Sequence, residues 1–175
     1  MTTAAAPQRS RAGVSTVAGA LFSTKPTNTA VDVGLTAVRI ALAWIFIYYG
    51  AGKLFGAFSG PGIHNTALYM SNTAHLHPGG FFAVLGGVIE FGGGVALALG
   101  IFSRLGALAL FGDQVMAMIT VTWANGISNS LTGGAGYQLN LALAVLAVAI
   151  VALGPGRLSA DYLLGRRLSG STAGP

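Results

Sequence analysis

The sequence predicts an all-α integral membrane protein, a four-helix bundle with both termini in the cytoplasm. Three observations support this fold class. Of the 175 residues, 53% are hydrophobic and only 7% are charged, whereas an average soluble domain has about 25% charged residues. Four apolar segments approach the roughly 20 residues that a helix needs to cross a bilayer. Positive residues gather near one set of segment ends, and this pattern orients a membrane protein.

The chain is predicted to divide into three parts. Residues 1–30 are polar and rich in small residues, with no helical stripe of apolar positions, so we expect a disordered or surface-lying tail. Residues 31–154 form the membrane domain with its four transmembrane helices. Residues 155–175 follow a Gly-Pro-Gly stop and form a short amphipathic cytoplasmic segment.

The connections between the membrane segments differ in length. The predicted spans are Val31 to Leu54, Phe81 to Phe102, Leu105 to Ala124 and Tyr137 to Leu153. Only Ser103 and Arg104 separate the second span from the third, so these two helices form a tight antiparallel hairpin. A longer loop, Phe55 to Gly80, joins the first two spans and is rich in Gly, Pro, Asn and His.

The basic residues predict the orientation of the bundle. One side of the membrane holds both termini and the short hairpin turn, with Arg9, Arg11, Lys25, Arg104, Arg157, Arg166 and Arg167. The opposite side has Lys53 near its boundary, together with the three histidines. The positive-inside rule then predicts a multi-pass protein of the plasma (inner) membrane with both termini inside.

The C-terminal segment is predicted to lie at the membrane surface. Ser159 could cap a short helix that begins just after it. Tyr162, Leu163 and Leu164 would then face lipid, while Arg157, Arg166 and Arg167 meet headgroups.

Four charged residues form a candidate polar site within the membrane: Arg39, Lys53, Glu90 and Asp113. Asp32, Arg39, Phe46 and Lys53 are spaced by seven, so they share one face of the first helix. At about 1.5 Å per residue from the cytoplasmic ends, Arg39 lies about 10 Å deep and Asp113 about 12 Å deep. These matched depths predict an Arg39–Asp113 ion pair. The alternative is that such a pair is only an internal strut without chemistry.

Glu90 lies within the stretch GGVIEFGGG, where an intramembrane carboxylate marks a functional site. Its helical neighbours three and four residues away are Gly86, Gly87, Gly93 and Gly94, which would line a slot for a ligand or a neighbouring backbone. We expect Glu90 to be largely protonated or bonded to Gln114, because burial disfavours the charged form. The alternative is that the glycines only allow close helix packing.

Several classes of function are excluded or disfavoured. The absence of cysteine excludes disulfides, thiol nucleophiles and cysteine-ligated iron–sulfur clusters. No phosphate-binding loop is present, and the scattered basic residues predict no nucleic-acid binding. His64, His75 and His77 lack a third ligand at defined spacing, so we predict no metal site.

The arrangement of the four spans and several sequence motifs resemble the DoxX family of small four-helix membrane proteins. The matching features are Arg39, GAGKLFG at 50–56, IEFGGGVALALGIFSRLGALAL at 89–110 and LGPGRLSADYLL at 153–164. The fourth span carries Gln138 and Asn140 where many relatives carry an acidic residue. The resemblance implies a membrane subunit linked to redox metabolism. Some similar proteins are small membrane subunits of thiosulfate:quinone oxidoreductases, and others accompany assemblies that handle oxidative or thiol stress.

The leading functional hypothesis is therefore a membrane subunit or anchor of an oxidoreductase assembly, more consistent with a non-catalytic subunit than with an enzyme acting alone. It has no intrinsic cofactor, and the four charged residues would offer a quinone-sized site, with electrons supplied by a protein partner. Besides the lipid bilayer, we expect protein partners in a membrane complex. The alternatives are a non-enzymatic scaffold of a larger complex and a small-solute or proton pathway.

Overall fold

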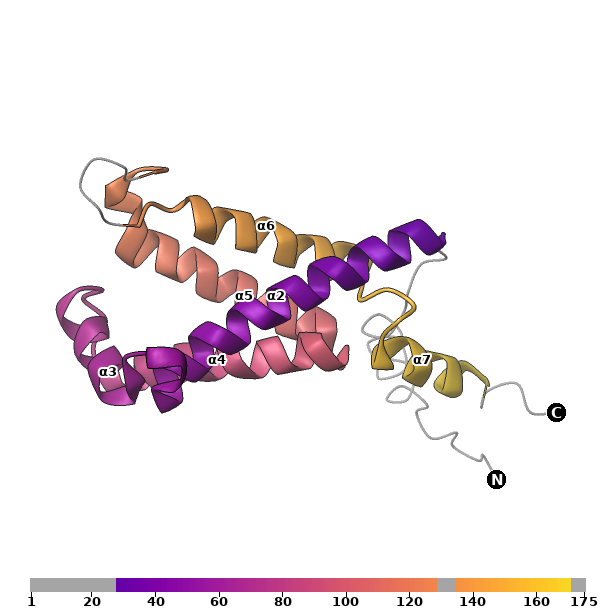
Figure 1. Ribbon diagram of the computed structural model, residues 1–175, viewed down its shortest axis with the longest axis horizontal. Helices are drawn as coiled ribbons and strands as arrows, with labels where there is room; N and C mark the ends of the chain where they lie inside the picture. Colours follow the sequence, from indigo (N-terminus) through magenta and orange to yellow (C-terminus); the bar gives the residue numbers. More distant parts are fainter. Residues whose placement is uncertain (1–27, 129–134, 171–175) are drawn as a thin grey trace, which may run out of the picture.

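The protein is all-helical, and its long helices lie side by side (Figure 1). The computed structural model describes residues 28–128 and 135–170, and for residues 167–170 the backbone alone. Three helical stretches are long and apolar enough to cross a membrane: α2 (Thr29–Phe55), α4 (Gly79–Leu99) and the continuous stretch Ser103–Asn125. The last comprises α5 (Ser103–Ala117), a π-helical segment η2 (Met118–Thr122) and the short η3 (Trp123–Asn125). A shorter apolar helix, α6 (Gln138–Leu153), completes the bundle.

The helix boundaries follow the predicted segments closely. α2 begins at Thr29, two residues before the predicted start, because the side chain of Asn28 accepts a hydrogen bond from Val31 N and caps the helix. α4 ends at Leu99, before the predicted Phe102, since Gly100 adopts a left-handed conformation with φ of 68°. The predicted hairpin between α4 and α5 is present. The N-terminal tail, with Arg9, Arg11 and Lys25, lies outside the described residues.

The connection between α2 and α4 is helical, although the sequence indicated only a loop. It contains a short helical turn η1 (Ala57–Ser59) and the helix α3 (Gly62–Asn72), which packs against α4. Thr66 is the buried residue of α3; its hydroxyl donates to Gly62 O within the helix at 2.7 Å and lies 3.4 Å from Lys53 O of α2. The Gly and Pro residues of this segment indicated a loop. The helix α3 is stabilised mainly by its packing against α4, and less by the intrinsic helix propensity of its residues.

The bundle has two ends that differ in the elements they hold. The α3 end holds α3, the end of α2, the start of α4, η2, η3 and the start of α6 (Figure 1). The opposite α7 end holds the start of α2, the α4–α5 turn and the C-terminal helix α7 (Ala160–Gly170). Figure 1 also shows α2 crossing the bundle obliquely, near α6 at its start and beside α3 and α4 at its end. The outer halves of α2 and α6 therefore diverge toward the α3 end.

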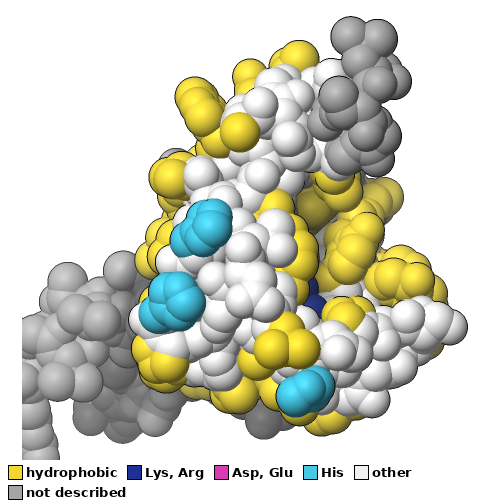
Figure 2. Space-filling view, turned by 90° about the vertical axis from the view of Figure 1, so that its left-hand side faces the viewer, with side chains coloured by type: hydrophobic (Ala, Val, Ile, Leu, Met, Phe, Trp, Pro, Cys, Tyr) yellow, Lys and Arg dark blue, Asp and Glu magenta, His cyan; other side chains and the backbone are white. Residues whose placement is uncertain are grey.

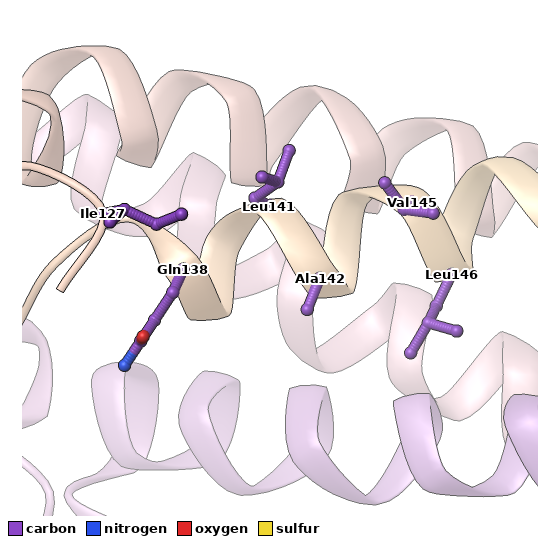
Figure 3. A pocket seen from close by; sticks show the side chains of 6 residues that line it. All are labelled: Ile127, Gln138, Leu141, Ala142, Val145 and Leu146. Carbon is purple, nitrogen blue, oxygen red and sulfur yellow. The ribbon is translucent and has the colours of Figure 1, made fainter.

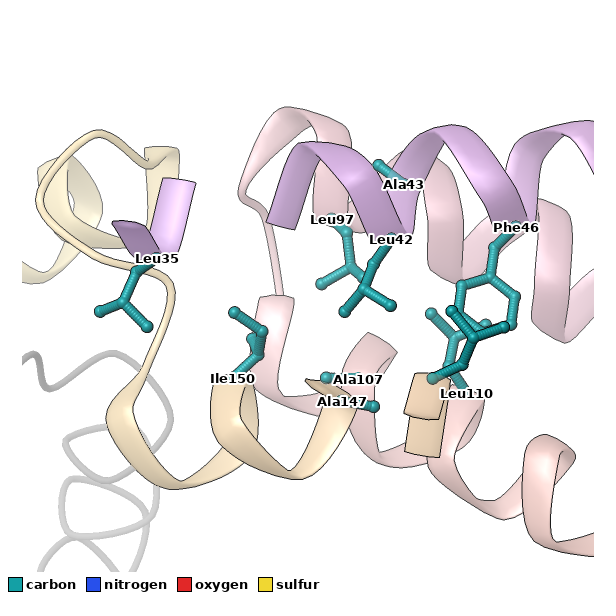
Figure 4. Packing of buried hydrophobic residues seen from close by; sticks show 10 residues of the cluster. Leu35, Leu42, Ala43, Phe46, Leu97, Ala107, Leu110, Ala147 and Ile150 are labelled. Carbon is teal, nitrogen blue, oxygen red and sulfur yellow. The ribbon is translucent and has the colours of Figure 1, made fainter. Parts of the chain in front are cut away.

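An apolar core occupies the half of the bundle nearer the α7 end (Figure 4). It is built from all four long helices, by Leu35, Leu42, Ala43, Phe46, Leu97, Ala107, Leu110, Leu143, Ala147 and Ile150. Buried polar side chains lie beyond this core at both ends. The bundle thus has a polar layer at each end and an apolar layer between them.

α2 and α4 cross at very close range, with their backbones in contact through glycine. A methyl group added to Gly50 would lie 2.8 Å from Cα of Phe91, which is far inside van der Waals contact. On α4, a methyl group added to Gly94 would lie 2.9 Å from N of Ile47. Small residues at such positions let two membrane helices approach closely.

Candidate functional site

The four charged residues of the predicted polar site separate into two clusters. Arg39 lies at the α7 end, while Lys53, Glu90 and Asp113 lie toward the α3 end. The predicted Arg39–Asp113 pair is wrong, because the Arg39 guanidinium donates from Nη1 to Pro155 O at 2.9 Å and from Nη2 to Leu158 O at 2.7 Å. The segment after α6 thus satisfies the buried cation with two backbone carbonyls.

The α7-end cluster consists of Asp32, Arg39, Arg157, Ser159 and Asp161. Asp161 is 1% exposed, and its two carboxylate oxygens accept hydrogen bonds from Phe102 N and Ser103 N, each at 2.8 Å. These amides begin α5, so Asp161 caps that helix from a distant part of the chain. Ser159 Oγ accepts from Tyr162 N at 3.2 Å, which confirms the predicted cap of α7. The cluster closes this end of the bundle structurally.

The C-terminal helix keeps part of its predicted surface character. Leu163 and Leu164 are exposed, and Tyr162 lies within cation–π distance of two arginines, with Arg157 5.8 Å and Arg166 5.9 Å from the ring centroid. The side chain of Arg167 lies outside the described residues. Because Asp161 on the same helix is buried, α7 is docked on the bundle as well as amphipathic.

The α3-end cluster begins with an ion pair that the depth count did not predict. Lys53 Nζ of α2 donates to Glu90 Oε1 of α4 at 2.7 Å. The Lys53 side chain is 26% exposed, whereas that of Glu90 is 5% exposed. Glu90 Oε2 is buried and has no hydrogen-bond partner among the described residues. The expected hydrogen bond between Glu90 and Gln114 is not formed, because Gln114 hydrogen-bonds to Asp113 and Asn140.

Polar side chains continue from Glu90 across α5 to α6. The Asp113 carboxyl lies close enough to that of Glu90 to interact with it. Asp113 Oδ2 accepts from Gln114 Nε2 at 3.0 Å, and Gln114 Oε1 accepts from Asn140 Nδ2 at 3.0 Å. Thr122 Oγ1 of the π-helical segment then donates to Asn140 Oδ1 at 3.2 Å. The α3-end cluster is therefore Lys53, Glu90, Asp113, Gln114, Thr122 and Asn140.

The glycines expected to line a slot beside Glu90 mostly contact neighbouring helices. A methyl group added to Gly87 would lie 2.6 Å from the Leu54 side chain, and one added to Gly93 would lie 2.8 Å from that of Leu110. Gly94 abuts the backbone of α2. Gly86 differs, because its added methyl group would lie 3.6 Å from Asp113 Oδ1, at ordinary contact distance. Only Gly86 thus borders the acidic pair, and the other three allow close packing.

The surface at the α3 end is hollowed. In Figure 2 this face carries the histidine side chains, and a Lys or Arg side chain is visible at the bottom of the hollow. Among the Lys and Arg residues of the described helices, Lys53 is the one at the α3 end. An apolar groove of about 420 Å³ runs along α6 and is lined by Ile127, Gln138, Leu141, Ala142, Val145 and Leu146. Figure 3 shows Gln138, Ala142 and Leu146 on the side of α6 that faces α2.

The three histidines do not converge on one another. His64, His75 and His77 are all exposed at the α3 end. Within the described ranges, no three His, Cys, Asp or Glu side chains come together in a group that could hold a metal ion.

Sequence reasoning overlooked three members of these clusters. Thr122 and Asp161 received no role, and Asn140 was noted only as a departure from an acidic residue. A polar residue in an otherwise apolar span was the available signal for Thr122 and Asn140, since such residues form hydrogen bonds between helices. For Asp161 the signal was weaker, because an acidic residue near a helix start usually caps its own helix.

Comparisons with known proteins agree with the membrane architecture. The family profile described as DoxX matches residues 34–123. The chain is 31% identical over 138 residues to the inner membrane protein YqjF of Escherichia coli (strain K12), an alignment that covers 78% of this chain and 95% of that protein. No solved structure gives a significant match.

Proposed function

Because the chain belongs to the DoxX family of integral membrane proteins, we propose that it is a membrane subunit or anchor of an oxidoreductase assembly. The protein is located in the inner membrane and has several candidate spans. In this proposal the α3-end cluster binds the polar part of a quinone-sized molecule. A partner protein supplies the electrons.

One observation carries the proposal: the buried carboxylate oxygen Glu90 Oε2 receives no hydrogen bond from a donor group of the described residues, and the side chain beside it is a second carboxyl, that of Asp113. A buried polar group without a partner costs about 1–3 kcal/mol, so its persistence calls for a reason. A proton shared with the neighbouring Asp113 carboxyl, or a bound molecule that hydrogen-bonds to Glu90, would remove this cost. The neighbouring Lys53 ammonium and the Asp113 carboxyl make the site both a donor and an acceptor.

The residues present fit a quinone in their chemistry. A quinone carbonyl accepts hydrogen bonds, and Lys53 or a protonated carboxyl of the acidic pair can donate them. The apolar groove along α6 suits a ring or an isoprenoid tail, since its lining is mostly aliphatic. The chain's own contribution is to bind and orient the molecule and to hold a proton beside it.

The proposal includes four spans with both termini in the cytoplasm. α6 is antiparallel to α5 and packs along it, although it has only 16 residues. The described basic residues Arg104, Arg157 and Arg166 lie at the α7 end, which the positive-inside rule assigns to the cytoplasm. Single cysteines at Ser71 and Ser169 should react with an impermeant thiol reagent from opposite sides. Reaction of both from outside intact cells would refute this topology.

The direct test is ligand retention by the purified protein. After mild-detergent extraction from native membranes, we expect the wild-type protein to retain a redox partner and quinone. Glu90→Leu removes the hydrogen-bonding group at this position, and we expect it to bind a short-chain quinone about tenfold more weakly in equilibrium dialysis, the loss of about one hydrogen bond. Asn72→Ala, an exposed change at the same end of the bundle, serves as the control. Equal quinone binding by all three proteins would exclude a quinone site at Glu90.

The packed glycines favour a second candidate, a non-enzymatic scaffold of a larger membrane complex. Gly87, Gly93 and Gly94 are occupied by neighbouring side chains or backbone, as expected if the α4 glycines serve assembly. Under this alternative, Glu90→Gln would leave all partner binding and redox activity intact. Co-purified partners without any redox centre would also favour the scaffold.

A further inference from the structure

We infer that the α3-end cluster exchanges its proton and its ligand with the α3 side of the membrane only. The inference deepens the proposed function, because it fixes the side from which a bound molecule is served. Access can be measured without any quinone, so it stands or fails separately from ligand identity.

Both ends of the polar cluster reach toward the α3 side. At one end, the Lys53 side chain is 26% exposed, and a basic side chain lies at the bottom of the hollow in Figure 2. At the other end, Asn140 is half-buried and Thr122 belongs to the π-helical segment next to the loop. Hydroxyl, amide and ammonium groups between these points can hydrogen-bond water, which a polar path into a protein requires.

The hydrogen bonds of the cluster all point toward the acidic pair. Thr122 donates to Asn140, Asn140 to Gln114, and Gln114 to Asp113. From the opposite side, Lys53 donates to Glu90. The donors thus converge on two neighbouring carboxyl groups, which are the natural place for a proton.

Counting the charges of the cluster supports a shared proton. The facing groups are the Lys53 cation from α2, two carboxyls from α4 and α5, and neutral amide and hydroxyl groups from the other elements. One proton between Glu90 and Asp113 makes the cluster electrically neutral, and a net charge at this depth is costly. A proton that enters from water on the α3 side returns to the same side, with no net transport.

The opposite route is closed by the apolar layer. On α5, the half-buried Asp113 and the buried Ser103 are separated by ten residues, or about 15 Å along the helix. Between them the buried side chains of α5 are Ala107 and Leu110. The other helices contribute Leu42, Phe46, Leu97, Leu143, Ala147 and Ile150 at the same level (Figure 4). Such a dry layer offers water no partners, which disfavours the third hypothesis, a transmembrane proton or solute pathway.

Single cysteines can test the inference cleanly, because the chain has none of its own. In membrane vesicles of each orientation, a charged, impermeant methanethiosulfonate should modify Thr122→Cys and Asn140→Cys from the α3 side alone. Ala107→Cys and Ala147→Cys lie at fully buried positions of the apolar layer and should resist modification from both sides. The exposed His77→Cys serves as the positive control for the α3 side.

Three results would overturn the inference. They are modification of either cluster variant from the α7 side, modification of either apolar-layer variant, and protection of both cluster variants while His77→Cys reacts. Infrared spectroscopy of the wild-type protein gives a second test that needs no cysteine. A protonated carboxyl band that Glu90→Gln removes should shift rapidly in deuterated water, and a band that fails to exchange would show that the cluster is sealed.

Discussion

The crossing of α2 and α4 makes a quantitative prediction about two glycines of the same helix. Gly50 touches the backbone of Phe91, whereas no described atom lies within 4 Å of a methyl group added to Gly34. Alanine at either position gains roughly 1 kcal/mol of helix propensity over glycine. Only Gly50→Ala must also overcome a clash, and a backbone cannot rotate away as a side chain can.

The difference between the two variants isolates the steric cost, because the propensity gain cancels. Overpacking costs about 1–3 kcal/mol. We therefore expect Gly34→Ala to be at least as stable as the wild type, and Gly50→Ala to be less stable than Gly34→Ala by about 1–3 kcal/mol. At roughly 2–4 °C per kcal/mol for a chain of this size, the two thermal midpoints should differ by several degrees.

The assay measures thermal unfolding of all variants in the same detergent, with circular dichroism as the signal. The same crossing can be tested from α4, where Gly94 abuts the α2 backbone and Gly92 has no described atom within 4 Å of its added methyl group. Gly94→Ala should therefore lose stability relative to Gly92→Ala. Equal thermal midpoints within both pairs would refute the close crossing of α2 and α4. They would favour the hypothesis that the glycines line a ligand slot beside Glu90.

The other predictions concern the two polar clusters. Asp161→Ala should lose about 2–3 kcal/mol, because two buried amides at the start of α5 lose their acceptor, and Leu163→Ala on the exposed face of α7 is the matched control. The same thermal assay would contradict the cap if both variants unfolded alike. Arg39→Lys should also be destabilised, since one ammonium cannot reproduce the two-armed contact with backbone carbonyls. Lys53→Met and Glu90→Met should each destabilise the protein by removing the hydrogen-bond partner of the other side chain, and the double variant should recover part of that loss. Strict additivity of the two changes would argue against the pair.

Much of the membrane architecture follows from local sequence properties. Long apolar runs determine the spans, and turn residues such as Gly100 determine where they stop. The period of seven correctly placed Asp32, Arg39 and Phe46 on the buried face of α2, with Lys53 half-buried at its end. These features depend on neighbours along one helix, so the sequence alone is enough to predict them.

The partners of the charged groups depend on how the helices tilt and cross, and only the tertiary structure decided them. Depth counting treated each helix as upright, but α2 has 27 residues, or about 40 Å, and crosses the bundle obliquely (Figure 1). This crossing carries Lys53 to Glu90 and leaves Arg39 at the opposite end. There it meets carbonyls more than a hundred residues away in the chain. Asp161 likewise finds the unpaired amides of α5 only because the segment after α6 folds back onto the bundle. Helix formation is a local property, whereas an ion pair or a distant cap requires two segments to arrive at the same place.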